Sequence, residues 1–215
     1  MISIPHRTPF FLPVLYPDLT WRIQNDRKEL YLTFDDGPVP GPTEFVLETL
    51  ASRNIKATFF CIGDNIRKHP EVFQKIVSQG HAIGNHTFNH LNGWKTTPPL
   101  YLENIKKCDR IIKESRSQTS NLKPQTQLFR PPYGRITKKQ IQSLSNYKII
   151  MWDVLSVDYN KNLPQERCLK NTIRATRPGS IIVFHDSFKA EKNLTHALPA
   201  FIDHFLEQGF TFHSL

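Results

Sequence analysis

The chain has 215 residues, enough for one large domain, and its 39% hydrophobic and 22% charged residues are typical of a globular protein with a buried core. Its formal charge of +9 favours contact with polyanions, but the basic residues are spread over helix-like segments and no nucleic-acid-binding motif is present, so we expect no nucleic-acid partner. The three cysteines are far apart and form no C-x-x-C pair, which argues against a cysteine zinc site or a disulfide framework and favours buried free thiols.

Residues 1–28 precede the regular pattern of the chain, and we interpret them as an N-terminal arm over a domain of residues 29–215. The arm lacks the charged-then-apolar layout of a secretory signal, and its apolar run is broken by Pro13 and is too short to span a bilayer. From the sequence alone we therefore expect no transmembrane segment, a cytoplasmic location and, by preference, a monomer.

Strand-like and helix-like segments alternate from residue 29 onward. The predicted strands are 29–34, 57–62, 81–85, 126–129, 148–154, 180–184 and 210–214. The predicted helices are 43–53 with Thr43 as N-cap, 69–80, 98–118, 137–145, 164–177, and 193–208 with a possible kink at Pro199. Most of the strands are continuous apolar runs, which are typical of a parallel sheet that is buried on both faces.

This alternation fits both an open doubly wound sheet and a closed barrel. No glycine-rich phosphate-binding motif follows any predicted strand, which weakens the nucleotide-binding form of the open sheet. We therefore favour an α/β barrel with parallel strands.

Polar residues gather just after the predicted strands. They are Asp35 and Asp36 after the first strand, His86 and His90 after the third, Arg130 and Tyr133 after the fourth, Asp153 and Asp158 around the end of the fifth, and His185 and Asp186 after the sixth. In a parallel barrel all these strand ends share one face, where such folds build their active sites. The pattern therefore indicates a catalytic site.

The segment H-T-F-N-H places His86 and His90 four residues apart. On a helical turn, positions i and i+4 lie on one face, so both imidazoles could bind one ion. The spacing alone is weak evidence in a chain with nine histidines. A carboxylate from another strand end would complete a set of two histidines and one aspartate, which is typical of catalytic zinc with an open position. The other histidines are not accompanied by a comparable set of ligands, and we interpret them as structural: His6, His69, His81, His196, His204 and His213.

The motifs T-F-D-D-G-P, H-T-x-x-H, R-P-P-Y-G and V-F-H-D follow one another along the chain. Their order and spacing resemble the successive motifs of the polysaccharide deacetylase family (carbohydrate esterase family four, the NodB-homology domain). The resemblance covers residues 29–213. It implies a distorted seven-stranded TIM-like (β/α) barrel as the catalytic domain, and metal-dependent removal of N-acetyl or O-acetyl groups from a polysaccharide.

The resemblance also implies a role for each matching residue. Asp35 resembles the catalytic base, and the metal ligands are Asp36, His86 and His90. Arg130 matches the residue that holds the base, Tyr133 the residue whose backbone N–H binds the oxyanion, and His185 the general acid. The residues assigned to substrate binding are Tyr133, Val183, which would line the pocket for the acetyl methyl group, and Trp152.

The chemistry of these residue types supports the assignment. A zinc-bound water has a pKa of about 7, and a carboxylate must accept its proton. Successive residues on an extended chain point to different sides, so Asp36 can face the ion while Asp35 faces the attacking water. His185 can protonate the departing amine, because the intrinsic pKa of histidine is about 6.5.

The segment W-D-V-L-S-V-D-Y departs from the family pattern, which usually carries an acid at the position of Leu155 and a tryptophan at that of Tyr159. That acid tunes the histidine acid, and Leu155 cannot do so. Either Asp153 or Asp158 takes its place, or His185 works with a less tuned pKa.

We therefore expect a metal-dependent deacetylase that acts on an N-acetylglucosamine-containing glycan such as peptidoglycan or a chitin-like oligomer. Zinc is the expected metal, and cobalt or nickel also suits the ligand set. An O-acetyl esterase of the xylan type and a catalytically impaired glycan-binding relative are the alternatives. The glycan substrates of this family are mostly extracytoplasmic, which contrasts with the location expected from the arm.

Overall fold

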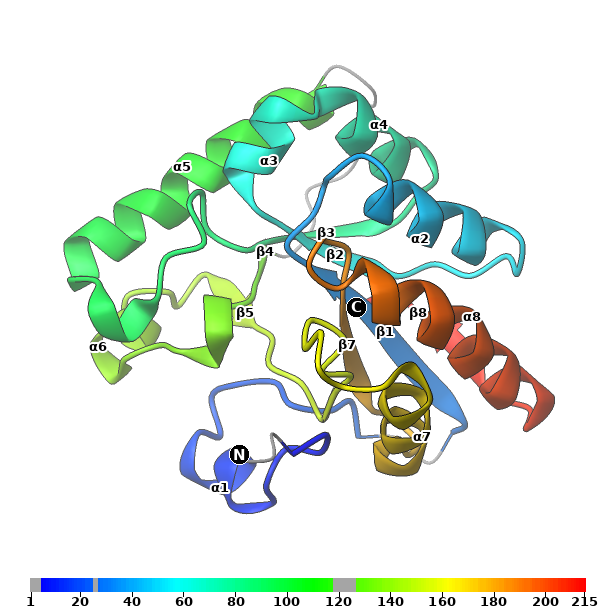
Figure 1. The fold of residues 1–215 in the computed structure, drawn as a ribbon. Helices are drawn as coiled ribbons and strands as arrows, with labels where there is room; N and C mark the ends of the chain where they lie inside the picture. Colours follow the sequence, from blue (N-terminus) through cyan, green and yellow to red (C-terminus); the bar gives the residue numbers. More distant parts are fainter. Residues whose placement is uncertain (1–4, 25–26, 118–126) are drawn as a thin grey trace.

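The computed structural model describes residues 5–24, 27–117 and 127–215 and contains a curled sheet with helices on its outer side (Figure 1). The strands are β1 (Glu29–Asp35), β2 (Thr58–Cys61), β3 (Ala82–Asn85), β4 (Gln127–Phe129), β5 (Tyr147–Ile149), β6 (Val154–Leu155), β7 (Ile181–His185) and β8 (Thr211–His213). Their order is β5-β4-β3-β2-β1-β7-β6, with β8 paired to the first half of β1. Each of these strand pairings is parallel, so the predicted distorted α/β barrel is confirmed.

All six predicted helices are present, with shifts at their ends. The helices are α1 (Phe11–Leu15), α2 (Pro42–Ala51), α3 (Gly63–Lys68), α4 (Pro70–Ser78), α5 (Pro98–Ser117), α6 (Lys138–Gln142), α7 (Gln165–Ala175) and α8 (Glu191–Glu207), which continues through Pro199. The sequence did not indicate α1 or α3, because both are short and α3 carries no apolar repeat. None of the helices in the described ranges combines the length and the apolar character that crossing a bilayer requires.

Strand β1 shows why the strands are apolar throughout. Leu30, Leu32 and Phe34 point outward into the main hydrophobic core, where Phe34 stacks on Phe59 and the α8 side chains close the layer. The alternate side chains, among them Thr33 and Asp35, point into the barrel. Both faces are therefore buried, and the inward face carries the polar groups. The three cysteines are buried and free, as predicted.

The N-terminal arm (residues 5–24) fills the opening between the edge strands β5 and β6. Thr20 donates its N–H to the Ile149 carbonyl at 2.9 Å and accepts the Met151 N–H at 2.7 Å. At the end of the same segment, Val154 forms an antiparallel bridge with Arg7 of the arm. The single strand predicted at 148–154 is therefore wrong: the arm takes up the hydrogen bonds of the middle of this segment, which separates β5 from β6.

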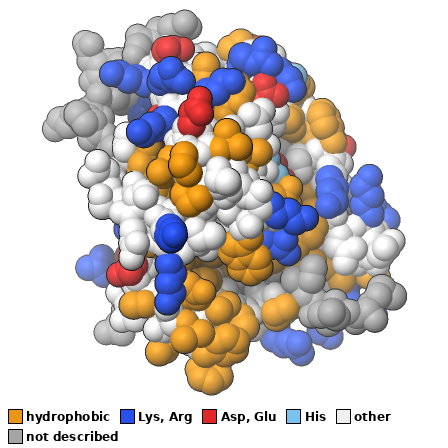
Figure 2. Space-filling view, turned by 90° about the vertical axis from the view of Figure 1, so that its left-hand side faces the viewer, with side chains coloured by type: hydrophobic (Ala, Val, Ile, Leu, Met, Phe, Trp, Pro, Cys, Tyr) orange, Lys and Arg blue, Asp and Glu red, His pale blue; other side chains and the backbone are white. Residues whose placement is uncertain are grey.

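The arm also carries exposed apolar side chains. Phe10 is 88% exposed, Val14 77% and Leu15 62%. Figure 2 shows hydrophobic side chains gathered at the lower end of this face, where Figure 1 shows α1.

Candidate active site

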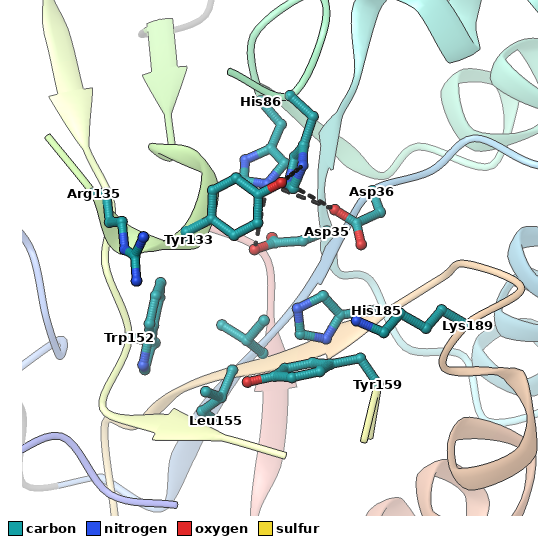
Figure 3. A pocket seen from close by; sticks show the side chains of 12 residues that line it. Asp35, Asp36, His86, Tyr133, Arg135, Trp152, Leu155, Tyr159, His185 and Lys189 are labelled. Atoms are coloured by element: carbon teal, nitrogen blue, oxygen red, sulfur yellow. Dashed lines mark hydrogen bonds and ion pairs between the residues drawn. The ribbon is translucent and has the colours of Figure 1, made fainter. Parts of the chain in front are cut away.

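A cavity of about 480 Å³ opens where the strands β1, β3, β4 and β7 end (Figure 3). It is lined by Asp35, Asp36, His86, His90, Tyr133, Arg135, Trp152, Leu155, Tyr159, Val183, His185 and Lys189. Every predicted site residue except Arg130 therefore lines one cavity, and Arg130 lies buried directly behind Asp35. The six histidines interpreted as structural do not line it.

Arg130 is fully buried inside the barrel and holds Asp35 in place. Its Nη1 donates to Asp35 Oδ1 and to the Thr33 hydroxyl, both at 2.7 Å. Its other nitrogens donate to the carbonyls of Met151 at 2.9 Å and Ile150 at 3.2 Å, and its guanidinium lies over the Phe60 ring. A buried charge of this kind is tolerated only when it is paired and hydrogen-bonded throughout. Asp35 thus has one fixed orientation, with an oxygen left to face the cavity.

Asp36, His86 and His90 form the candidate metal group. Their possible ligand atoms lie within 4.8 Å of one another, and Asp36 Oδ1 is 3.2 Å from His90 Nε2 and 3.8 Å from His86 Nε2. The expected helical turn between the two histidines is wrong. The segment is a loop in which Thr87 and His90 adopt positive φ angles of 63° and 55°, and this loop brings the rings together.

The surroundings of the two imidazoles suit a metal. His86 Nδ1 lies 2.8 Å from the Arg130 carbonyl oxygen, which can only accept, so the proton sits on Nδ1 and Nε2 keeps its lone pair. His90 Nδ1 lies 3.1 Å from the Tyr133 hydroxyl. Burial lowers the pKa of His86 to about 4, against the opposing charge of Asp35, which favours the neutral ring that a metal needs.

Asp36 supplies the negative charge of the group. Burial acts to raise its pKa, but the hydrogen bond with His90 and the charges of the surrounding histidines outweigh this and hold the pKa well below its usual value. The group therefore offers one carboxylate and two imidazole nitrogens, a donor set that fits a catalytic divalent ion.

The turn after β1 is held from behind by Asp186, a residue to which the sequence gave no role. Asp186 Oδ1 accepts the Gly37 N–H at 3.0 Å, and Oδ2 accepts the Thr43 hydroxyl at 2.6 Å. A Cβ on Gly37 would lie 1.9 Å from Asp186, so only glycine fits there. Burial raises the pKa of Asp186 to about 8, although both hydrogen bonds act to lower it. Thr43 is therefore not the N-cap of α2, which begins after Gly41.

His185 is paired with Asp158, which decides between the two acids that the sequence left open. Asp158 is fully buried, and its two oxygens accept the His185 Nδ1–H at 2.7 Å and the His185 backbone N–H at 2.8 Å. Burial acts to lower the pKa of His185, but the charge of Asp158 and its hydrogen bond outweigh this and raise the pKa to about 9. Asp153 instead pairs with Arg177 and Ser180.

Tyr133 lies at the tip of the 3₁₀ turn η2 (Pro132–Gly134) and has a positive φ of 61°. The residue is 60% exposed. Its backbone N–H donates to no other described residue. A strained residue with a free donor at the edge of a cavity is a candidate for binding an oxygen of a ligand.

The wall opposite the metal group is apolar. Leu155 on β6 and Val183 on β7 are paired in register and pack together with Val157. The rings of Trp152 and Tyr159 contact the same cluster. Leu155, which stands where the family pattern has an acid, therefore adds to the apolar surface beside Val183. The acid that pairs with His185 is Asp158 instead.

Comparisons with known proteins agree with this geometry. The sequence model described as polysaccharide deacetylase matches residues 22–152. A peptidoglycan-N-acetylglucosamine deacetylase of Bacillus cereus is 35% identical over 75% of this chain, and the match spans 57% of that relative's length. A chitooligosaccharide deacetylase of a Bradyrhizobium species is 28% identical over 83% of this chain and 80% of its own length.

A solved structure shares the fold over nearly the whole chain. It is the Bc1960 peptidoglycan N-acetylglucosamine deacetylase in complex with 4-naphthalen-1-yl-N-oxidanyl-benzamide, with a TM-score of 0.85 and 31% identity. The superposition covers 97% of this chain and 95% of that one.

Proposed function

Because the chain belongs to the polysaccharide deacetylase family, we propose that it hydrolyses the N-acetyl groups of an N-acetylglucosamine-containing glycan. One observation carries the proposal: a candidate metal group, a carboxylate held by Arg130 and a histidine held by Asp158 all face one cavity. Amide hydrolysis needs these three parts, namely an electrophilic centre, a proton acceptor and a proton donor.

Asp35 acts as the general base in this proposal. The carboxylate faces the cavity while Arg130 fixes its other oxygen, so it can accept the proton of an attacking water without turning away. A divalent ion bound by Asp36, His86 and His90 would supply a Lewis acid that polarises the acetyl carbonyl and increases the acidity of water. Zinc is the proposed metal, and cobalt or nickel would also suit two imidazoles and one carboxylate.

His185 acts as the general acid. Asp35 and His185 are register partners on the neighbouring strands β1 and β7, so both side chains emerge on the same side of the sheet. Because Asp158 occupies Nδ1, Nε2 is the atom that can protonate the departing amine. A pKa of about 9 keeps the ring protonated at neutral pH until the proton is needed.

Four further lining residues contact the substrate in this proposal: Tyr133, Val183, Leu155 and Trp152. The free N–H of Tyr133 would donate to the oxygen that becomes negatively charged, and a donor at this position is typically worth about 10²–10³ in rate. Val183 and Leu155 would contact the methyl group, and the ring of Trp152 would contact the sugar.

An acetate-release assay on three substrates tests the proposal: N-acetylglucosamine oligomers, peptidoglycan and acetylated xylan, each with and without a chelator. We expect release from the first two, loss of activity with chelator, and recovery when zinc is added back. Release from acetylated xylan alone would instead establish an O-acetyl esterase. No release from any substrate by metal-loaded protein would leave only a glycan-binding role.

A further inference from the structure

Two cationic side chains line the cavity without a carboxylate partner. Asp35 is paired with Arg130, His185 with Asp158, and Asp36 with the two metal-group histidines. In contrast, neither Arg135 nor Lys189 has an ion pair to any described residue. Both are exposed. The two unmatched positive charges are therefore available to a ligand.

Aromatic rings hold both cations at the cavity. The Arg135 guanidinium lies 5.2 Å from the Trp94 ring centre, and the Lys189 ammonium lies 5.2 Å from that of Tyr159. A ring contact of this kind limits the motion of a long side chain but leaves its charge uncompensated. The chain as a whole carries +9, so unpaired basic residues are expected elsewhere on the surface. It is the position of these two at the cavity, rather than their number, that supports a role.

The two cations lie on opposite sides of the cavity, with Asp35 and His185 between them (Figure 3). A glycan that crosses the cavity with one sugar at His185 would bring a neighbouring sugar toward each cation. A chitin-like homopolymer has no charge on either neighbour. A copolymer in which N-acetylglucosamine alternates with an acid-bearing sugar has a carboxylate on both.

We propose that Arg135 and Lys189 are specificity residues that select a glycan with carboxylates on the sugars next to the one that is deacetylated. The inference rests on the proposed deacetylase function and narrows its substrate to an acidic alternating copolymer, such as peptidoglycan whose lactyl groups or stem peptides end in carboxylates. The contacts are exposed, so each contributes modestly to binding and more to the choice between acidic and neutral glycans.

The test compares KM and kcat on two glycans of equal length: a neutral N-acetylglucosamine oligomer and a peptidoglycan oligomer with free lactyl carboxylates. The variants are Arg135→Ala, Lys189→Ala and their combination. We expect each single change to raise KM for the acidic glycan, relative to the neutral one, by about 2- to 5-fold, with kcat little changed. Raising the salt from low to physiological strength should erode the preference of the unmodified protein in the same direction.

Two kinds of control variant sharpen the comparison. Arg135→Lys and Lys189→Arg keep the charge and should keep most of the preference, whereas a steric role would not be rescued. Lys170→Gln removes an exposed charge of α7 that does not line the cavity, and it should leave the ratio of the two KM values unchanged.

The outcomes separate this inference from the function on which it rests. Equal losses on both glycans, or no loss on the acidic one, would overturn the specificity role while leaving the deacetylase function intact. If the metal-loaded protein released acetate from neither glycan, the proposed function would fail and this inference with it.

Discussion

Asp35 and Asp36 are neighbours in the sequence but have different surroundings. Asp35 is 4% exposed and paired with a buried arginine, whereas Asp36 has a φ of 86° and faces His86 and His90. The positive φ turns the second carboxylate away from the first, and each acid has its own cationic or metal-binding partner. The like-charge repulsion of the pair is thus offset on both sides, and the two acids can perform different tasks.

Asp158→Asn tests whether this acid sets the proton affinity of His185. Burial acts to lower the pKa of His185, but the charge and hydrogen bond of Asp158, together with the charges of Asp36 and Asp35, raise it to about 9. Without the carboxylate the pKa should fall well below 9, so a smaller fraction of the ring should carry the proton that a general acid needs. The alkaline limb of the kcat/KM profile should then move to lower pH, and activity at pH 7 should fall by up to about 10²-fold.

The control is Asp153→Asn, which removes another buried acid of the same segment that does not contact His185. It should lower stability but leave the alkaline limb of the kcat/KM profile in position.

The His185–Asp158 pair also predicts that the free energy of unfolding depends on pH, which urea denaturation at several pH values would measure. Because the folded pKa of His185 is raised, the contribution should be complete below about pH 6.5 and lost as the pH rises through about 9. If Asp158→Asn changed neither the kcat/KM profile nor the pH dependence of stability, Asp158 would not set the proton affinity of His185.

At the scale of the elements, helix α2 and Asp186, which directly follows β7, hold the candidate metal ligand Asp36 in place indirectly. Asp186 links the Gly37 backbone to the Thr43 hydroxyl on α2. The Asn65 side chain donates to the Asp36 carbonyl at 2.7 Å, which ties the same turn to α3. The position of Asp36 therefore depends on two helices that do not line the cavity.

Thr43→Val should weaken this support. The change removes one of the two hydrogen bonds to the buried Asp186 and should cost about 1–3 kcal/mol of the free energy of unfolding. Metal affinity should fall as well, because the turn that carries Asp36 loses a supporting hydrogen bond.

Thr49→Val is the matched control on the same helix. The Thr49 hydroxyl donates only to the Phe45 carbonyl within α2, so its loss should cost less and leave metal affinity unchanged. Equal effects of the two changes would show that Asp186 does not support the site.

The strand ends could be predicted from the sequence because burial on both faces leaves a plain apolar signal, as in T-F-F-C on β2. The loops could not. His86 and His90 converge through two positive φ angles rather than through a helical turn, and residue spacing does not encode that path.

The partner of His185 could not be predicted either. It depends on the turn at Val157, which has a φ of 59°, so the sequence did not distinguish Asp153 from Asp158. The strand expected at 148–154 failed because its partner is the distant arm.

At the scale of the whole molecule, the arm completes the barrel and supports the site from outside. Thr20 is hydrogen-bonded to the backbone on both sides of Ile150, and the carbonyls of Ile150 and Met151 in turn hold Arg130. Trp21 anchors the arm, since it is only 9% exposed and packs in the cluster that contains Phe129 and Met151. The position of Asp35, the proposed general base, is therefore coupled to the packing of the arm.

Trp21→Ala should lower the free energy of unfolding by about 3–5 kcal/mol, because it removes a large buried side chain, and should also lower kcat by loosening Arg130. Urea denaturation and acetate release measure the two effects. Trp94→Ala, the same change at a residue that is 64% exposed, should cost about 1 kcal/mol or less. If both changes lowered stability equally, the arm would not be part of the folded core.

Our central proposal is that Asp35 acts as the general base and Asp36 as a metal ligand. Metal content and acetate release, measured on the same preparation of Asp35→Asn, test it most directly. We predict that this variant binds one divalent ion per chain, as the unmodified protein should, while acetate release falls by about 10²–10⁴-fold. Asp36→Asn should instead lose the ion. An Asp35→Asn protein that still released acetate at the normal rate, or that had lost its metal, would contradict the claim.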